Sequence, residues 1–210
     1  MKQPDRLSAP VIIGLTGAYC AGKNHIAQFL EDRGLPVLDV DKAGHEAIEL
    51  EKNAILERFG TSILGKDGTV DRRLLGARVF GKPEALAALE GIVHPRANEL
   101  TDAWLDKHQG KPCVINAAVL HKSSVFSRLS FIILVKAPTL IRLFRAQKRD
   151  HLAWGHLIKR FNSQKEFAAQ YLRKNADIYI VYNSGFWSCL FKGSVERQLD
   201  AILSLKRVIV

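Results

Sequence analysis

Five short runs of apolar residues along the chain predict the strands of a buried sheet. The runs lie at 11–15, 35–41, 112–120, 131–136 and 178–182. They are apolar at most positions instead of alternating, which is typical of parallel strands that helices cover on both faces. Helices are predicted between them, such as an amphipathic segment at 25–33 that ends at Gly34, and a last helix at 194–206. The pattern therefore predicts an α/β fold with a doubly wound, five-stranded parallel sheet.

The interval between the second and third strands is longer than one crossover requires. Helices are predicted there at 43–58, 71–80, 83–93 and 95–108. Asp71 is the expected N-cap of the second of these helices, and the pair His94–Pro95 predicts a break before the last one, with Pro95 as its first residue. The interval is a candidate helical subdomain that binds a second substrate.

Composition narrows the class of protein without identifying it. The 210 residues are 47% hydrophobic and 25% charged, which is ordinary for a globular protein with one good core. The net charge of +10 favours polyanionic ligands, and nucleic acids, nucleotides and phosphorylated cofactors fit it equally well.

The cysteines and the apolar segments bear on the compartment. Cys20, Cys113 and Cys189 are far apart and lack C-x-x-C spacing, so neither a disulfide framework nor a zinc site is predicted. The N-terminal residues form no continuous apolar leader, and no run is long enough to span a bilayer. A cytoplasmic location without membrane association is expected.

The first apolar run continues into a candidate phosphate-binding loop. Gly17 and Gly22-Lys23 have the spacing G-x4-G-K, in which glycines allow close backbone approach and the following helix start attracts anions. That spacing occurs by chance in roughly one chain in twenty of this length, so the alternative is a glycine-rich turn that binds nothing. The residues expected to contact a nucleotide are Gly17, Ala18, Tyr19, Cys20, Ala21, Gly22, Lys23, Asn24 and His25.

The second apolar run ends in two carboxylates, Asp39 and Asp41. Because neighbouring parallel strands end at one edge of a sheet, both are expected near the phosphate site. There, Asp41 is a candidate base for an attacking hydroxyl, or either carboxylate is a candidate Mg²⁺ ligand. The alternative for Asp41 is that it only caps the following helix.

The sequence offers few candidate ligands for a magnesium ion. Asn24 stands where the complete loop motif has a Ser or Thr hydroxyl for Mg²⁺, although its amide oxygen still reaches a metal. The third strand is followed by Leu120-His121-Lys122 and no acid. The metal candidates are therefore Asn24 and Asp39, both weak.

Basic residues gather after the fourth strand. Arg142, Arg145 and Arg149 are spaced i, i+3 and i+7 and share one helical face, where guanidinium groups suit the charge on a transferred phosphoryl group. The alternatives are a solvated basic face and a nucleic-acid footprint. Asn183, after the fifth strand, either reads an adenine edge or makes the turn.

Taken together, these residues resemble the dephospho-CoA kinase family of P-loop kinases, which are similar to nucleoside monophosphate kinases. The shared features run over most of the chain: Gly14-Leu-Thr16-Gly17 with Gly22-Lys23, Asp39-Val-Asp41 with His45, Asp71-Arg72 with Val79-Phe80, Leu89-Glu90 with His94-Pro95, Arg145, Arg149-Asp150, Arg160, Gln164, Ala176-Asp177 and Asn183. The sequence departs from the family at Asn24, and at 116–121, where the family usually has Pro-Leu-Leu-x-Glu.

The resemblance implies ATP- and Mg²⁺-dependent phosphorylation of the ribose 3′-hydroxyl of dephospho-CoA. It implies a nucleotide-binding core (1–61, 111–138 and 171–210), a helical acceptor-binding insertion (62–110) and a helical lid (139–170). The implied catalytic residues are Asp41 as base, Lys23 on phosphate, and Arg145 and Arg149 closing over ATP. The implied acceptor contacts are Thr16, Asp41, His45 and His94.

Two other functions remain open from sequence. One is a P-loop kinase for a nucleoside monophosphate or another small acceptor. The other is a basic nucleic-acid-binding protein, or a catalytically weakened nucleotide binder, on the same scaffold. Aromatic residues are not interleaved with Lys and Arg in a stacking pattern, so no nucleic-acid partner is expected. The oligomeric state is not predicted.

Overall fold

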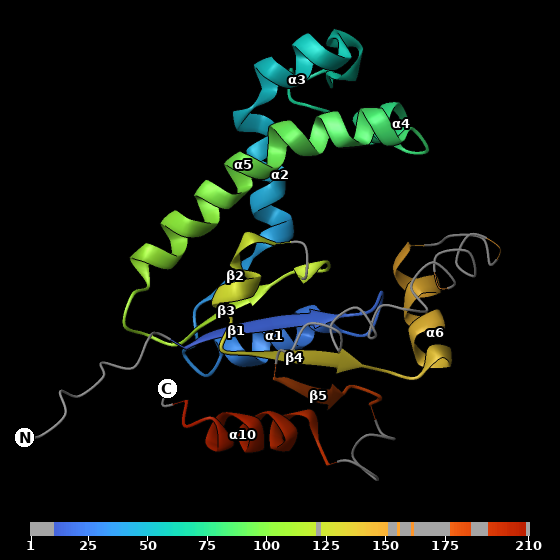
Figure 1. The fold of residues 1–210 in the computed structure, drawn as a ribbon. Coiled ribbons are helices and arrows are strands. Elements are labelled where there is room, and N and C mark those ends of the chain that lie inside the picture. Colours follow the sequence, from blue (N-terminus) through green and yellow to red (C-terminus); the bar gives the residue numbers. More distant parts are fainter. Residues whose placement is uncertain are drawn as a thin grey trace, which may run out of the picture. The chain divides into compact units, whose positions relative to one another are not determined.

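The computed structural model contains a five-stranded sheet (Figure 1). It describes residues 11–120, 123–150, Gly155, Phe161, 177–185 and 193–208. The strands are β1 (Ile12–Gly17), β2 (Val37–Asp39), β3 (Cys113–Asn116), β4 (Phe131–Lys136) and β5 (Ile178–Tyr182). Their order is β2-β3-β1-β4-β5, and β1 pairs in parallel with both β3 and β4. The predicted doubly wound parallel sheet is confirmed.

The strand order places the end of β1 at a topological switch point. β2 and β3 lie on one side of β1, and β4 and β5 lie on the other. In open α/β sheets the crevice for ligands forms beyond the carboxyl ends of the strands at such a reversal. All six residues of β1 are buried, which explains its continuous apolar run.

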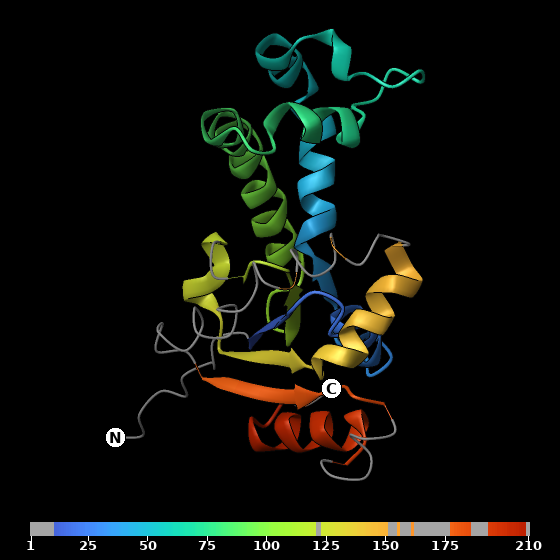
Figure 2. The same cartoon turned by 90° about the vertical axis from the view of Figure 1, so that its right-hand side faces the viewer.

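Two helices complete the core around the sheet. Helix α10 (Val195–Leu205) runs alongside β5 (Figure 2). It buries Leu199, Ile202 and Leu203, and helix α1 (Lys23–Glu31) buries Ile26, Ala27 and Leu30. These side chains join one hydrophobic cluster with those of β1, β3, β4 and β5. Each fully buried Leu or Ile contributes about 1.5–3 kcal/mol to folding, so this cluster holds the sheet rigidly behind the loop.

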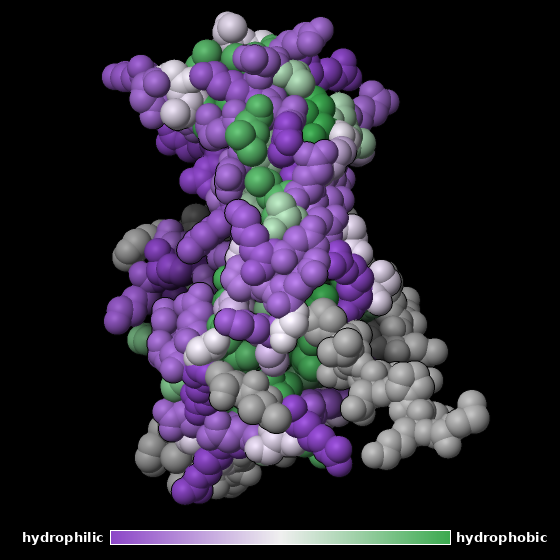
Figure 3. All heavy atoms as spheres, turned by 90° about the vertical axis from the view of Figure 1, so that its left-hand side faces the viewer, coloured by the Kyte–Doolittle hydropathy of each residue, from purple (hydrophilic) through white to green (hydrophobic). Residues whose placement is uncertain are grey.

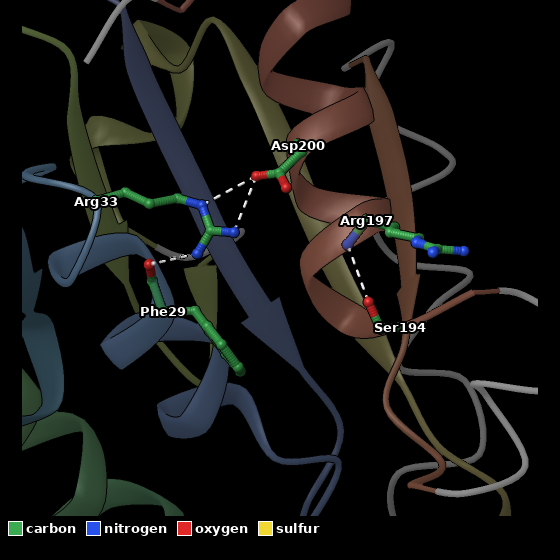
Figure 4. Close-up of polar contacts among 5 residues, drawn as sticks. All are labelled: Phe29, Arg33, Ser194, Arg197 and Asp200. Carbon is green, nitrogen blue, oxygen red and sulfur yellow. Dashed lines mark hydrogen bonds and ion pairs between the residues drawn. The ribbon is translucent and has the colours of Figure 1, made fainter.

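An ion pair at the surface links α10 to the turn after α1 (Figure 4). Arg33 Nε and Nη2 lie 3.0 Å and 2.9 Å from Asp200 Oδ1, and Arg33 Nη1 donates to the Phe29 carbonyl at 3.2 Å. Ser194 caps α10 by accepting from the Arg197 N–H. Because the Asp200 side chain is 57% exposed, the pair contributes about 1 kcal/mol or less.

Residues 39–107 form a second compact unit with its own core. It contains α2 (Val40–Leu50), α3 (Lys52–Phe59), the 3-10 helix η1 (Thr61–Ile63), α4 (Arg72–Val79) and α5 (Pro83–Lys107). The core of this unit is made of Ala47, Ile55, Ile63, Val70, Leu75, Val79 and Val93. The unit starts before residue 62 because α2 packs against α5.

Several predicted element boundaries were wrong. The predicted helix at 43–58 is two helices separated at Glu51, and the strand predicted to reach Asp41 ends at Asp39. The break predicted at His94–Pro95 does not occur, because α5 runs through Pro95. Burial of side chains on both sides of the proline offsets the roughly 3 kcal/mol that a helical proline costs.

Two further elements border the sheet. A 3-10 helix, η3 (Ser124–Arg128), precedes β4, and α6 (Thr139–Asp150) follows it. Arg160 and Gln164, two of the residues that carry the family resemblance, lie outside the described residues. On the face shown in Figure 3, hydrophilic residues cover most of the described surface. Among the helices of the described part of the chain, none has the length and apolarity to cross a bilayer.

Candidate phosphate-binding site

The turn from β1 into α1 has the backbone of an anion-binding loop. Gly22 is the N-cap of α1 in the left-handed region (φ 92°), and no side chain caps the helix. Within the turn, the Ala21 N–H donates to the Ala18 carbonyl at 2.9 Å and the His25 N–H donates to the Gly22 carbonyl at 3.0 Å. The first turn of the helix therefore presents N–H groups and a partial positive charge at the end of β1.

Both glycines of the motif are required by packing. A Cβ atom on Gly17 would lie 2.9 Å from the Val135 carbonyl oxygen, and one on Gly22 would lie 2.1 Å from Asn183 Nδ2. The G-x4-G spacing thus reflects close approach of the loop to β4 and to the segment after β5. Cys20 lies in the left-handed region with a φ of 57°, although it carries a side chain.

Helix α6 directs its arginines toward this loop. Arg142 Nε donates to the Tyr19 carbonyl at 2.8 Å, and Arg145 NH1 donates to the Ala21 carbonyl at 3.2 Å. The Arg149 guanidinium lies 5.0 Å from the centre of the Tyr19 ring and pairs with the Asp150 carboxylate at 2.7 Å. The i, i+3, i+7 spacing thus places three cations beside the loop.

Tyr19 also links the loop to α6 through its side chain. Its hydroxyl donates to Asp150 Oδ2, and its ring packs edge-on against Phe161 with the centroids 5.7 Å apart. Neither contact was predicted, since both depend on segments more than a hundred residues away.

Two predicted site residues are buried beside the loop. The Asn183 side chain donates to the Ala21 carbonyl at 3.1 Å, and its Oδ1 accepts from Arg145 NH2 at 3.4 Å. The Thr16 hydroxyl is fully buried and donates to the Ala118 carbonyl at 3.4 Å. In the described structure both side chains make contacts within the protein, and their predicted contacts with ligands stay predictions.

The candidate metal position is made of two asparagines. Asn116 is 2% exposed at the end of β3, and its Nδ2 donates to Asn24 Oδ1 at 3.4 Å. The oxygen of Asn116, Oδ1, is buried and has no hydrogen-bond partner among the described residues. Among the described residues no group of three or more His, Cys, Asp and Glu side chains could hold a metal ion. Amide oxygens fit a Mg²⁺ ion held mainly by phosphates and water, but not an all-protein cage.

The carboxylates after β2 have different local roles. Asp39 Oδ1 accepts from the backbone N–H groups of Asp41 and Lys42, at 3.1 Å and 3.4 Å, and so caps α2. The capping alternative considered for Asp41 was therefore wrong, since Asp39 is the cap. Asp41 lies in the first turn of α2 and is exposed.

Within the unit at 39–107, one open pocket has a volume of about 600 Å³. It is lined by His45, Glu49, Thr69, Val70, Asp71, Arg72 and Arg73. His45 Nδ1 lies 2.7 Å from Arg72 NH1, and because a guanidinium only donates, Nδ1 is the acceptor and the ring proton lies on Nε2. His94 is exposed on α5 and does not line this pocket.

Sequence reasoning missed two groups of residues here. The contacts of Arg142 and Asn116 had a partial signal, because Arg142 shares a helical face with Arg145 and Asn116 ends an apolar run. The pairings of these residues with Tyr19 and Asn24 had no sequence signal, because the partners lie about a hundred residues away along the chain.

The sheet order, the loop and the arginines beside it define the class: this is a P-loop kinase. Solved structures agree in fold. A dephospho-CoA kinase from Campylobacter jejuni aligns with a TM-score of 0.65 at 23% identity, over 93% of this chain and 97% of that one. A shikimate kinase from Acinetobacter baumannii aligns with a TM-score of 0.51 at 20% identity, over 94% and 95%.

The chain belongs to the dephospho-CoA kinase family, whose family model matches residues 11–187. A dephospho-CoA kinase of Treponema pallidum is 33% identical over 208 residues, which cover 94% of this chain and 96% of that protein. The Treponema denticola enzyme is 33% identical over 207 residues, covering 93% and 90%. A crystal structure from Thermus thermophilus aligns with a TM-score of 0.77 at 32% identity, over 94% of this chain and 98% of that one. The chain is therefore a phosphotransferase of a family that acts on a hydroxyl group.

Proposed function

We propose that this protein transfers the γ-phosphoryl group of ATP to the ribose 3′-hydroxyl of dephospho-CoA, giving CoA and ADP. The observation that carries the proposal is the loop at 17–23, which leads into the N-terminus of α1, as in anion-binding loops, and which two arginines of α6 contact. Family membership supplies the acceptor, because the relatives are named for it. We also propose a cytoplasmic location for the protein.

The residues of the core would hold the nucleotide. The loop N–H groups and the Lys23 ammonium bind the phosphates, and the guanidinium groups of Arg145 and Arg149 neutralise charge on the transferred group. Asn24 and Asn116 would offer amide oxygens to a Mg²⁺ ion, and such an ion would supply charge stabilisation on the phosphate oxygens.

The residues of the helical unit would hold the acceptor. Asp41 accepts the proton of the 3′-hydroxyl as general base. The pocket beside His45 carries the guanidinium groups of Arg72 and Arg73, which suit the pyrophosphate of a nucleotide-like acceptor. His94 is a further proposed acceptor contact in the helical unit. The sheet unit adds the proposed acceptor contact Thr16 and the proposed lid at 139–170.

Release of ADP by the pure protein tests the acceptor. With Mg-ATP, turnover should require dephospho-CoA, and AMP, UMP and an oligonucleotide should support little above background. Equal turnover with AMP or UMP would favour the first alternative, a kinase that acts on nucleoside monophosphates. ATP binding without turnover on any acceptor would indicate a weakened nucleotide binder.

The Asp41→Asn variant tests the proposed base. Because the amide cannot accept the proton, kcat should fall by roughly 10² to 10⁴, while the Kd for ATP measured by calorimetry changes little. The Lys23→Ala variant is the matched comparison, in which ATP affinity and rate should fall together. An unchanged kcat for Asp41→Asn would remove this residue from the mechanism.

A further inference from the structure

We infer that Arg142, Arg145 and Asn183 form a clamp on the carbonyl side of the phosphate loop, and that this clamp orients the loop for anion binding. These three residues are called the carbonyl clamp. Within it Arg142 and Asn183 are positioning residues, since the hydrogen bonds by which they would act are made to the loop backbone. The inference rests on the proposed function only in requiring that the loop binds phosphate.

The clamp contacts two carbonyl groups of the loop from one side. Arg142 Nε donates to the Tyr19 carbonyl at 2.8 Å. The Ala21 carbonyl accepts from Arg145 NH1 at 3.2 Å and from Asn183 Nδ2 at 3.1 Å. Arg145 NH2 also donates to Asn183 Oδ1 at 3.4 Å, so the two side chains that share Ala21 hold each other.

The geometry of the peptide bond converts these contacts into an orientation of N–H groups. In a planar trans peptide the C=O and the N–H point in opposite directions. The Tyr19 carbonyl shares its peptide with the Cys20 N–H, and the Ala21 carbonyl shares its peptide with the Gly22 N–H. Holding both carbonyls against α6 and Asn183 therefore turns the N–H groups of Cys20 and Gly22 to the opposite side of the loop.

The backbone angles of the loop fit the same orientation. Cys20 and Gly22 both have positive φ, 57° and 92°, on either side of Ala21, whose own N–H donates within the turn. Alternation of this kind makes the N–H groups of a turn converge into an anion-binding concavity. The left-handed Cys20 is unfavourable for a residue with a side chain, and the clamp supplies the contacts that hold it there.

The surroundings of Arg142 indicate that its position is fixed. Its guanidinium carbon lies 4.6 Å from the centre of the Phe161 ring, and its Nη2 is buried with no hydrogen-bond partner in the part of the chain that the structure describes. Burial lowers the pKa of Arg142 from its usual value. Burying part of a cation costs free energy. The simplest explanation for an arginine at this position is therefore its hydrogen bond to the Tyr19 carbonyl, which the guanidinium group provides.

Asn183 fits the clamp better than it fits adenine recognition. Its side chain is 6% exposed, and both ends of the amide are occupied, by the Ala21 carbonyl and by Arg145. An amide that reads a base edge must offer a donor and an acceptor to the base instead. Loss of Asn183 is therefore expected to weaken phosphate binding whatever base is attached.

Calorimetric binding of inorganic tripolyphosphate and of ATP tests the clamp, because tripolyphosphate lacks the base. Arg142→Ala and Asn183→Ala should each weaken the binding of both ligands by about tenfold or more, as expected for a lost hydrogen bond from a charged or buried group. Lys148→Ala, which removes an exposed charge from the same helix, should change both affinities by less than about twofold.

Arg142→Lys covers the case in which Arg142→Ala does not fold, which urea unfolding reports. Lysine keeps the charge but not the planar fork, so tripolyphosphate binding should be intermediate. Wild-type affinity for tripolyphosphate in the Arg142 variants would overturn the clamp. An Asn183→Ala variant that loses affinity only for ATP would instead assign Asn183 to the base. If the wild type binds neither ligand, the phosphate loop itself fails, and the clamp fails with it.

Discussion

At the scale of single residues, the phosphate loop combines a strained backbone with unusual side chains. Cys20 occupies a left-handed conformation, and Asn24 offers an amide where the complete motif has a hydroxyl. Both positions are at the loop that binds phosphate in the proposed reaction. A single substitution at each position measures the cost of the deviation, which is in folding stability at Cys20 and in Mg²⁺ affinity at Asn24.

Cys20→Gly should stabilise the protein. A non-glycine residue at a φ of 57° costs about 1 kcal/mol relative to glycine, so the midpoint of urea unfolding should rise accordingly. Cys20→Ala is the control, because it removes the thiol and keeps the Cβ that causes the strain. Equal midpoints for the glycine and alanine variants would show that the loop carries no backbone strain at this residue.

Asn24→Ser should strengthen Mg²⁺ binding in the nucleotide complex. The Asn24 amide oxygen accepts a hydrogen bond from Asn116. A serine at this position has a shorter side chain, and its hydroxyl can bind a phosphate-bound Mg²⁺ ion as in the complete motif. We expect the Mg²⁺ concentration needed for half-maximal binding to the ADP complex to fall several-fold in calorimetric titration. Asn24→Ala, which offers no oxygen, should not improve it. Identical titrations for the serine and alanine variants would disprove a metal role for this residue.

At the scale of elements, the position of α6 beside the loop and of α10 beside β5 determines the site. Helix α6 follows β4 directly, and its arginines reach the turn after β1 because β1 and β4 are neighbours. Helix α10 covers the core and is linked to the start of β5 by Lys206 and Asp177. The site depends on these helix-to-sheet contacts as much as on the loop sequence.

The ion pair between Lys206 and Asp177 should contribute a pH-dependent stability. The hydrogen bond from Lys206 Nζ to Asp177 Oδ2, at 2.6 Å, raises the pKa of Lys206 above its usual value. A lysine whose pKa is higher in the folded protein than in the unfolded chain stabilises the fold at pH values below its unfolded-state pKa. This stability is lost as pH rises through the pKa of Lys206 in the folded protein. Because the Asp177 side chain is 64% exposed, Asp177→Asn should destabilise by only about 0.5 kcal/mol near neutral pH.

Urea unfolding at neutral and strongly alkaline pH measures this effect. The difference between wild type and Asp177→Asn should disappear at a pH above the folded pKa of Lys206. Asp200→Asn is the matched control, because its partner Arg33 stays charged at any accessible pH and its difference should persist. If the difference in unfolding free energy between wild type and Asp177→Asn is independent of pH, this difference does not arise from the ion pair.

At the scale of the whole molecule, the chain divides into a sheet unit and a helical unit, each with its own core. The phosphate loop, its arginines and Asn183 belong to the sheet unit, and the pocket beside His45 belongs to the helical unit. In the proposed function the nucleotide phosphates and the acceptor pyrophosphate are thus assigned to different compact units. Each ligand is expected to stabilise the fold independently of the other.

ATP alone should raise the stability of the whole protein. At about 100 times its Kd a ligand that binds only the folded state stabilises it by about 2.7 kcal/mol, which is a clear rise in melting temperature. Lys23→Ala should lose most of this rise, because the phosphates provide much of the binding. Adenosine, which has no phosphates, should give little rise in the wild type. A rise with adenosine as large as that with ATP would contradict a phosphate-centred site.

The sequence by itself determined the features that depend on local pattern. Buried parallel strands must be apolar on both faces, so 131–136 and 178–182 were predicted at their observed positions. The G-x4-G-K spacing predicted the loop, because a glycine is required wherever the backbone approaches another chain segment closely. Family membership follows from the order and spacing of such features along the chain.

Only the tertiary structure decided which distant residues meet. The continuity of α5 through Pro95 depends on buried side chains on both sides of the proline, Val93 before it and Thr101 and Leu105 after it, which outweigh the local preference for a break. Arg142 contacts Tyr19, and Asn116 contacts Asn24, because the order of the strands makes neighbours of segments about a hundred residues apart. Hydrogen bonds require atoms within about 3 Å, and that proximity is a property of the folded chain, not of spacing along the sequence.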